Sequence, residues 1–311
     1  MIVSEKTEEQ LLEQIQRIEP FVGNTPLFPI NNAFQKPGIK IYAKLEWQQL
    51  GGSVKARPAF NIMKNAIING QLNKERHLLD ASSGNTAIAY AAIGAALGIP
   101  VTICLPENAS EERKILLRAH GAHIVYTSKF GSTDEAQEKA LELFNENPDK
   151  YFYADQYGNE NNWQAHYNTT AFEIFKQTES RISHFVTGLG TTGSFVGNSR
   201  RLKELNPDIQ LISLEPDSAL HGLEGWKHLE TAKVPRIYDA TIANENLEID
   251  TSEAYFWVKK VAQTEGILIS PSAGANLAGA IKVAQELDEG VIVTLFPDNA
   301  DKYGEVLNQL F

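Results

Sequence analysis

The sequence predicts an α/β fold in which helices cover mostly parallel sheets. Three observations support this prediction. Short apolar runs rich in β-branched residues alternate with longer helical stretches along the whole chain. Hydrophobic residues make up 42% and charged residues 22% of the 311 positions, which are ordinary values for a globular protein. No internal repeat or low-complexity tract interrupts the alternation. Strands that alternate with helices in this way form parallel sheets, because each crossover returns over a face of the sheet.

The expected elements follow one another in chain order. Seven apolar runs predict strands at residues 39–46, 77–80, 101–105, 123–126, 184–187, 209–214 and 291–296. Helical periodicity predicts helices at residues 59–69, 86–97, 111–120, 133–145, 195–205, 252–265 and 275–287, preceded by an acidic amphipathic helix at the N-terminus. Composition shifts near residues 47–52 and 146–150 are too weak for linkers, so we expect two interwoven lobes rather than two separate domains.

Charge and cysteine content restrict the functional class. The net charge is −11 and no segment concentrates Lys and Arg, which argues against nucleic acid and an anionic membrane surface as partners. No apolar stretch approaches the roughly 20 residues of a membrane span, and the first residues do not resemble a targeting peptide. The single cysteine, Cys104, lies in an apolar run and cannot form an internal disulfide. We therefore expect a cytoplasmic protein in which Cys104 is a buried hydrophobe.

The first of three chemically informative segments surrounds a lysine. Residues 49–59, with the sequence QLGGSVKARPA, follow an expected strand and open an expected helix. Two glycines allow a tight turn, and Pro58 is tolerated in a first helical turn. The positive end of the helix dipole disfavours the charged form of Lys55, as a nucleophilic amine requires. A solvated surface lysine is the alternative explanation for this segment alone.

The second segment, residues 81–87 with the sequence ASSGNTA, joins a strand to a helix rich in small residues. Its hydroxyl groups and the N–H groups of the helix start could bind a carboxylate. An ordinary helix N-cap would contain the same residue types.

The third segment, residues 187–194 with the sequence TGLGTTGS, follows a strand and precedes a helix. Glycines at this spacing can surround a phosphate group with backbone N–H groups. Gly188, Gly190 and Gly193 also fit the pattern G-x-G-x-x-G of dinucleotide sites, and Glu215 follows the next strand where an acidic partner would be expected. An NAD-dependent dehydrogenase is therefore an alternative, and a non-catalytic binding protein is another.

The three segments together resemble the pyridoxal-phosphate (PLP) dependent cysteine synthase and cystathionine β-synthase family, with most likeness to its cysteine synthase B (O-acetylserine sulfhydrylase) branch. Six ordered motifs carry the resemblance, namely VGNTPL at 22–27, GSVKARPA at 52–59, SSGNT at 82–86, LPEN at 105–108, GLGTTGS at 188–194 and EGI with SPSAGA at 265–275. The sequence departs from the family pattern at Ala56 and Ala87. The resemblance implies a fold type II (tryptophan synthase β-like) architecture. It also implies a smaller mobile lobe at 48–155, with the substrate-carboxylate loop, and a larger phosphate-binding lobe at 1–47 plus 156–311.

The resemblance also implies a role for each matching residue. Lys55 would form the Schiff base with PLP and later remove the α-proton of the substrate. Asn85 would contact the 3-oxygen of the cofactor, and Ser272 would face its ring nitrogen as a neutral hydroxyl. Ser272 could at the same time be the N-cap residue of the helix that follows. Cofactor-phosphate binding is expected of Gly190, Thr191, Thr192, Gly193 and Ser194. Substrate-carboxylate binding is expected of Ser82, Ser83, Asn85, Thr86 and Gln156. No metal site is expected.

The implied reaction is a β-replacement on an O-activated L-serine, with O-acetyl-L-serine and sulfide giving L-cysteine by way of an α-aminoacrylate. O-phosphoserine sulfhydrylase, cystathionine β-synthase-like and 2,3-diaminopropionate synthase activities are alternatives within the family. The expected partners are a small amino acid and sulfide, and the family resemblance suggests a homodimer.

Overall fold

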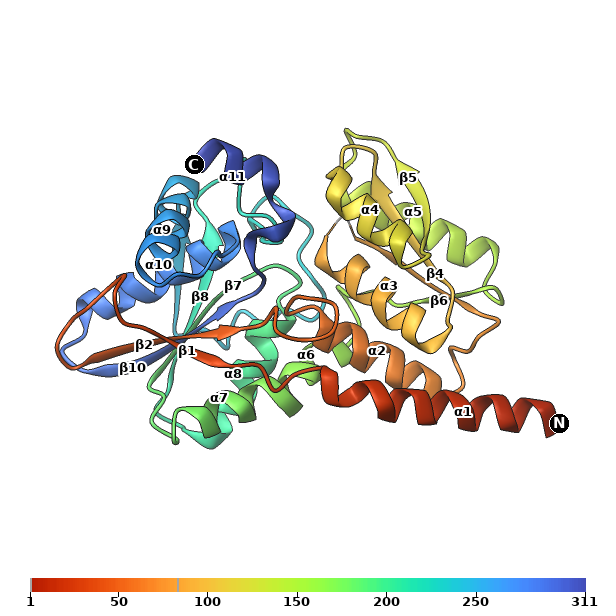
Figure 1. Cartoon of the computed structure of the whole chain (residues 1–311), viewed down its shortest axis with the longest axis horizontal. Helices are drawn as coiled ribbons and strands as arrows, with labels where there is room; N and C mark the ends of the chain where they lie inside the picture. The colour runs from red at the N-terminus through yellow and green to blue at the C-terminus, as the bar shows by residue number, and fades with distance from the viewer. Residues whose placement is uncertain (1, 83) are drawn as a thin grey trace. The chain divides into compact units, whose positions relative to one another are not determined.

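The computed structural model describes residues 2–82 and 84–311, and the chain forms two compact units (Figure 1). Unit 1 comprises Met1–Gly23 and Gln49–Asn162, and unit 2 comprises Asn24–Gln48 and Trp163–Phe311. The chain thus starts in unit 1, enters unit 2, returns to unit 1 and ends in unit 2. Each unit is therefore built from two separate segments of the chain.

Unit 1 contains a four-stranded parallel sheet in the order β5-β4-β3-β6. Its strands are β3 (His77–Ala81), β4 (Val101–Pro106), β5 (His123–Thr127) and β6 (Tyr151–Tyr153). Its helices are α1 (Ile2–Ile18), α2 (Ala56–Ile68), α3 (Asn85–Leu97), α4 (Glu111–Ala119) and α5 (Ser132–Glu146), with the short η1 (Glu19–Phe21) after α1. Leu78 and Ile103 pack with α2 and α3, whereas Leu79 and Cys104 pack with α5. The alternation of neighbours along β3 and β4 shows that helices cover both faces of this sheet.

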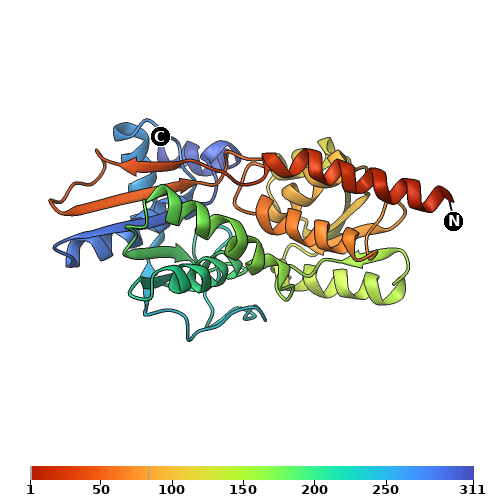
Figure 2. The same cartoon turned by 90° about the horizontal axis from the view of Figure 1, so that it is seen from below.

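Unit 2 contains a six-stranded sheet in the order β1-β2-β10-β7-β8-β9, in which only β1 is antiparallel. Its strands are β1 (Leu27–Ile30), β2 (Ile39–Leu45), β7 (His184–Gly188), β8 (Gln210–Pro216), β9 (Glu245–Ile249) and β10 (Gly290–Phe296). The helices are α7 (Ala171–Gln177), α8 (Gly193–Leu205), α9 (Thr251–Thr264), α10 (Pro271–Glu286) and α11 (Gly304–Leu310), with η3 (Ala300–Lys302) before α11. Helices α9 and α10 share a core with one face of the sheet, and α7 and α8 lie on its other side (Figures 1 and 2).

Most predicted elements are confirmed, with ends that shift by a few residues. Elements that the sequence did not predict are β1, β6, β9, α11 and the helical stretch formed by α6 (Asn161–Ala165), η2 (His166–Thr170) and α7. The predicted helix at 275–287 begins earlier, at Pro271, because Ser270 caps it. The first 23 residues, predicted with the larger lobe, lie in unit 1, since Leu11 and Ile15 pack into its core. A mobile role for unit 1 remains a prediction.

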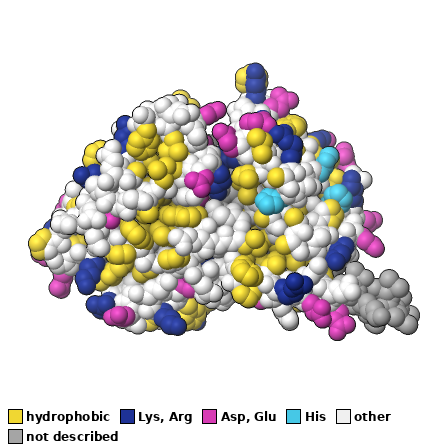
Figure 3. All heavy atoms as spheres, in the orientation of Figure 1, with side chains coloured by type: hydrophobic (Ala, Val, Ile, Leu, Met, Phe, Trp, Pro, Cys, Tyr) yellow, Lys and Arg dark blue, Asp and Glu magenta, His cyan; other side chains and the backbone are white. Residues whose placement is uncertain are grey.

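Two further predictions concern the surface and the membrane. Within the described part of the chain, no helix is long and apolar enough to span a membrane. On the face drawn in Figure 3, Lys and Arg side chains are dispersed among acidic and apolar ones. That face therefore offers no continuous basic surface to a nucleic acid.

Candidate active site

Lys55 lies where the sequence predicted, at the start of a helix in unit 1. It is the N-cap residue of α2, and its carbonyl accepts a hydrogen bond from the N–H of Ala59 at 3.0 Å. The Lys55 N–H donates to Ser53 Oγ at 3.3 Å. The preceding turn needs glycine, because Gly51 has φ +85° and a Cβ there would lie 3.3 Å from the Cα of Ala89 on α3. The turn thus packs Lys55's loop against the helix that carries Asn85 and Thr86.

The predicted carboxylate loop leaves β3 at Ala81 and enters α3 at Asn85. Ser82 Oγ accepts hydrogen bonds from the N–H groups of Gly84 and Ala87, both at 3.3 Å. Its hydroxyl therefore satisfies donors of the first turn of α3, as a capping residue does. Asn85 is half-buried at the first position of α3. Ser83, a predicted substrate-binding residue, lies outside the described residues.

Gln156, which came only from the family resemblance, lies against this loop. The Thr86 hydroxyl donates to Gln156 Oε1 at 2.7 Å, and Gln156 Nε2 donates to the Ala81 carbonyl at 2.9 Å. The Gln156 carbonyl accepts from Asn162 Nδ2 at 2.7 Å. The structure therefore brings Ser82, Thr86 and Gln156 together at the carboxyl end of β3, although Gln156 is 70 residues from Thr86.

The predicted phosphate loop of unit 2 connects β7 to α8 and is crowded by a later segment. A Cβ at Gly188 would lie 2.0 Å from Trp226 Cε2, and a Cβ at Gly190 would lie 2.0 Å from the Gly225 carbonyl oxygen. The Lys227 N–H donates to the Leu189 carbonyl at 2.8 Å and ties the two segments together. Glycine is thus required at both positions by the close approach of another backbone or ring.

The position and conformation of Thr192 are those of a residue in an anion-binding loop. It is the N-cap residue of the 13-residue helix α8 and has φ +70°, an uncommon conformation for a β-branched residue. Its Oγ1 is buried and has no hydrogen-bond partner among the described residues. The first N–H groups of any α-helix lack intrahelical acceptors and attract anions. A phosphate group fits here, because it would accept from both the Thr192 hydroxyl and the helix N-terminus. Thr191, Gly193 and Ser194 lie in the same turn, as predicted.

Ser272 is buried in the first turn of α10, but it does not cap the helix. Ser270 is the N-cap residue and accepts from the Ala273 N–H at 3.2 Å, while Pro271 occupies the first helical position. Proline is favoured there because it has no N–H to satisfy. The two hydroxyl groups of Ser270 and Ser272 are 3.1 Å apart. The expectation that Ser272 caps this helix is therefore wrong, and its role as partner of a ring nitrogen remains a prediction.

Asn276 is a residue that the sequence did not identify. Its side chain is buried on α10, and its Oδ1 accepts from the Gly188 N–H at 2.7 Å while its Nδ2 donates to the Leu295 carbonyl at 2.7 Å. These bonds connect the phosphate loop to β10. The only sequence signal was a polar residue within a helix of small residues, which has no distinctive pattern.

The acidic residue of the dinucleotide alternative has structural partners instead. Glu215 Oε2 accepts from the Leu229 N–H, and Oε1 accepts from Asn246 Nδ2, both at 2.9 Å. The carboxylate therefore stabilises the segment that follows Trp226 and the edge strand β9. Both oxygens of Glu215 accept hydrogen bonds from the protein itself. In a dinucleotide site the corresponding carboxylate would accept from a ribose hydroxyl group.

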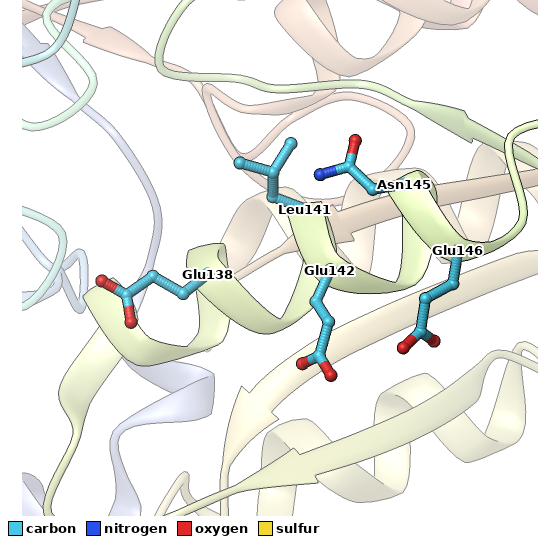
Figure 4. A pocket seen from close by; sticks show the side chains of 5 residues that line it. All are labelled: Glu138, Leu141, Glu142, Asn145 and Glu146. Carbon is cyan, nitrogen blue, oxygen red and sulfur yellow. The ribbon is translucent and has the colours of Figure 1, made fainter.

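Acidic and metal-binding side chains away from these loops form no competing cofactor site among the described residues. Among the described residues, no group of three or more His, Cys, Asp and Glu side chains could hold a metal ion. A hollow on the surface of α5 is lined by Glu138, Leu141, Glu142, Asn145 and Glu146, and Figure 4 shows its three carboxylates projecting away from the helix. Negative charge of this kind would repel a phosphorylated cofactor.

Comparison with known proteins decides among these alternatives. The family described as "Pyridoxal-phosphate dependent enzyme" matches residues 18–298 of the chain. The chain belongs to this family. It is a PLP-dependent α/β enzyme of fold type II, and the dehydrogenase and non-catalytic alternatives are wrong.

Two curated relatives cover nearly the whole chain. The cysteine synthase of Aquifex aeolicus is 43% identical over 295 residues, which are 93% of this chain and 90% of that protein. The cysteine synthase B of Escherichia coli is 35% identical over 288 residues, covering 92% and 93% of the two chains.

Solved structures confirm the fold. The cysteine synthase of Entamoeba histolytica matches with a TM-score of 0.87 and 30% identity, covering 94% of each chain. An O-ureido-L-serine synthase matches with a TM-score of 0.86 and 29% identity over 92% of each chain. PLP-dependent enzymes with different names are therefore similar to this one, and the fold alone does not select a substrate.

Proposed function

We propose that this enzyme replaces the β-substituent of an O-activated L-serine, with O-acetyl-L-serine and sulfide as substrates and L-cysteine as product. The observation that carries the proposal is the relative named cysteine synthase, which is 43% identical along 93% of the chain. The local structure of Lys55, of the carboxylate loop and of the glycine loop agrees with the roles that such a reaction needs.

Each predicted cofactor residue has its own proposed role. Lys55 would form the Schiff base, and Asn85 would contact the 3-oxygen of the ring. The loop from Gly190 to Ser194 would bind the phosphate, and Ser272 would hydrogen-bond to the ring nitrogen. When bound, PLP supplies the electron-withdrawing ring that stabilises negative charge at the substrate Cα. The protein supplies position, hydrogen bonds and the proton acceptor.

Substrate orientation would come from the loop at the carboxyl end of β3. Gln156 Nε2 carries two N–H bonds, and the Ala81 carbonyl accepts one of them. The other can donate to the carboxylate of an amino acid, together with hydroxyl groups of the loop. Fixing the carboxylate orients the Cα–H bond toward the base and lowers the entropic cost of proton transfer.

The amine of Lys55 would be the base that takes the α-proton of the substrate. The β-substituent would leave the β-carbon with its bonding electrons, and sulfide would add there. A carboxylate at this position would hold the ring nitrogen protonated and make the ring withdraw electrons more strongly, whereas the neutral hydroxyl of Ser272 would do so less. This difference would favour loss of the β-substituent over return of the proton to another position.

A matrix of steady-state assays tests the proposal. O-acetyl-L-serine, O-phospho-L-serine and L-serine are each combined with sulfide, homocysteine or ammonia as the nucleophile. The proposal expects the highest kcat/KM for O-acetyl-L-serine with sulfide. Greater efficiency with phosphoserine, homocysteine or ammonia would transfer the assignment to the corresponding alternative activity.

Lys55→Ala tests the assigned base, with Lys64→Ala on the same helix as the control. Lys64 is bound to Glu19 at the surface at 2.5 Å and has no part in the proposed reaction. Lys55→Ala should lose both the visible Schiff-base absorbance and turnover, while Lys64→Ala retains both. Turnover by Lys55→Ala at the parent rate would overturn the assignment.

A homodimer in the cytoplasm is also proposed. The chain has a single cysteine, Cys104, and cannot form an internal disulfide, which agrees with a reducing compartment. Light scattering after size-exclusion chromatography would decide the oligomeric state.

A further inference from the structure

A buried carboxyl group lies directly behind the carboxylate loop. Asp80 is in β3, one residue before its end, and only 1% of its surface is exposed. Its Oδ1 accepts from the Ala81 N–H at 2.9 Å, and its Oδ2 accepts from the Gln156 N–H at 3.3 Å. One side chain thus ties the end of β3 to the segment that follows β6.

Gln156 closes this connection into a ring of hydrogen bonds. Its side chain donates to the Ala81 carbonyl and accepts from the Thr86 hydroxyl, while its N–H donates to Asp80. Asp155, immediately before it, has φ +48°, so the backbone turns through a left-handed conformation at this point. Two acceptors on Asp80 therefore fix the backbone from which the Gln156 amide projects.

The surroundings make this carboxyl costly to bury. The pKa of Asp80 is raised to about 7, chiefly by burial and also by the negative charge of Asp155, while the N–H groups of Ala81 and Gln156 and the hydroxyl of Tyr90 lower it. A buried charge is rarely retained without a structural or functional use. The titratable side chains that interact electrostatically with Asp80 are Tyr90 of α3, Cys104 of β4, and Asp155 and Tyr157 of the segment after β6.

We propose that Asp80 is a positioning residue for the substrate carboxylate, acting through the backbone of Gln156 and Ala81. This proposal depends on the proposed function in one respect only, namely that the ligand is an amino acid. Above neutral pH the ionised carboxyl accepts both N–H groups, and the Gln156 amide and the loop from Ser82 to Thr86 keep the arrangement that binds the carboxylate. Asp80 itself does not contact the substrate.

Asp80→Asn separates this role from packing, since it keeps the shape of the side chain. The carboxamide has one accepting oxygen and one donating NH2 group. Either the Ala81 or the Gln156 N–H then faces a donor, and the tie to one of the two segments is lost. We expect the affinity for an amino acid to fall by about tenfold, which corresponds to about 1.4 kcal/mol.

The experiment titrates the PLP-loaded enzyme with L-alanine at pH 8 and follows the visible absorbance. L-alanine has no leaving group on its β-carbon, so the titration reports binding alone. Asp80→Asn should raise the Kd of L-alanine about tenfold and raise KM for O-acetyl-L-serine more than it changes kcat. Asp80→Glu, which retains two carboxylate oxygens, should bind more tightly than Asp80→Asn.

The matched control is Ile103→Val on the neighbouring strand, where Ile103 is fully buried beside Asp80 in the register of the sheet. It removes one methylene and costs about 0.5–1.5 kcal/mol of stability without touching the hydrogen bonds. The proposal would be overturned if Asp80→Asn bound L-alanine with the Kd of the parent. It would also be overturned if Ile103→Val raised the Kd as much as Asp80→Asn does.

Failure of the Asp80 proposal can be distinguished from failure of the proposed function. An enzyme that binds L-alanine but does not convert O-acetyl-L-serine still tests Asp80 through the Kd. If Asp80→Asn cannot be purified, Gln156→Ala and Asp80→Glu are compared instead. Gln156→Ala should show the loss expected of Asp80→Asn, with Asp80→Glu between it and the parent. Parent-like affinity in Gln156→Ala would then overturn the proposal.

Discussion

The raised pKa of Asp80 predicts an unusual dependence of stability on pH. The native pKa of about 7 exceeds the usual 3.8 because burial disfavours the charged form. Between these two values the folded protein binds a proton that the unfolded chain releases. Protonation of Asp80 therefore stabilises the fold at low pH, and that contribution is lost as the pH rises through 7.

The magnitude follows from the difference between the two pKa values. A difference of about 3 units corresponds to about 4 kcal/mol over the full titration, at 1.36 kcal/mol per unit. Between pH 5 and pH 8 the linkage relation gives a change of about 2–3 kcal/mol. Asp80→Asn cannot titrate, so the free energy of unfolding of the parent minus that of the variant should be about 2–3 kcal/mol larger at pH 5 than at pH 8.

Urea unfolding of the cofactor-free protein, followed by far-ultraviolet circular dichroism at four pH values, measures this difference. Asp149→Asn is the control, because Asp149 is exposed in the same unit. Other titrating groups cancel when parent and variant are subtracted. A difference that is constant within about 0.5 kcal/mol, or that grows toward pH 8, would refute the reasoning.

Three further predictions concern unit 2. Thr192→Val should leave the urea midpoint nearly unchanged, because the hydroxyl has no described partner, but should weaken PLP binding about tenfold in a fluorescence titration; equal affinities would contradict the phosphate assignment. Gly188→Ala should lower PLP affinity and destabilise the protein by about 1–3 kcal/mol. Adding Trp226→Ala should restore part of the affinity, because it removes the clash between the new Cβ and the Trp226 ring; no rescue would exclude that clash as the cause. Lys44→Met should cost about 3–5 kcal/mol in urea unfolding, because Lys44 is fully buried 2.7 Å from Glu173; the exposed Arg181→Ala should cost less than about 1 kcal/mol, and similar losses would contradict this.

The sequence was most informative where one residue type has one structural use. The apolar run of β4 and the glycine turn before Lys55 are examples, since local composition alone predicts them. Short edge elements were missed for a physical reason. β6 has three residues and β1 includes Pro29, so neither forms a run long enough to show a period. Their strand conformation comes from pairing with a neighbour.

The candidate site was predicted only in part because several of its bonds join distant positions. Lys55 and the glycine loop are local motifs, whereas Gln156 came from family resemblance. Asp80 looked like an ordinary end of a strand, and its second hydrogen bond reaches a residue 76 positions away. Asn276 binds the glycine loop across 88 positions. Such partners are set by tertiary packing, which a single sequence does not display.

The central claim is that the amine of Lys55 binds the aldehyde of PLP. Borohydride reduction of the PLP-loaded enzyme, followed by proteolysis and mass spectrometry, would fix the cofactor covalently to its lysine. The account predicts a pyridoxyl-phosphate group on the peptide that contains Lys55. Modification of another lysine in place of Lys55 would contradict it.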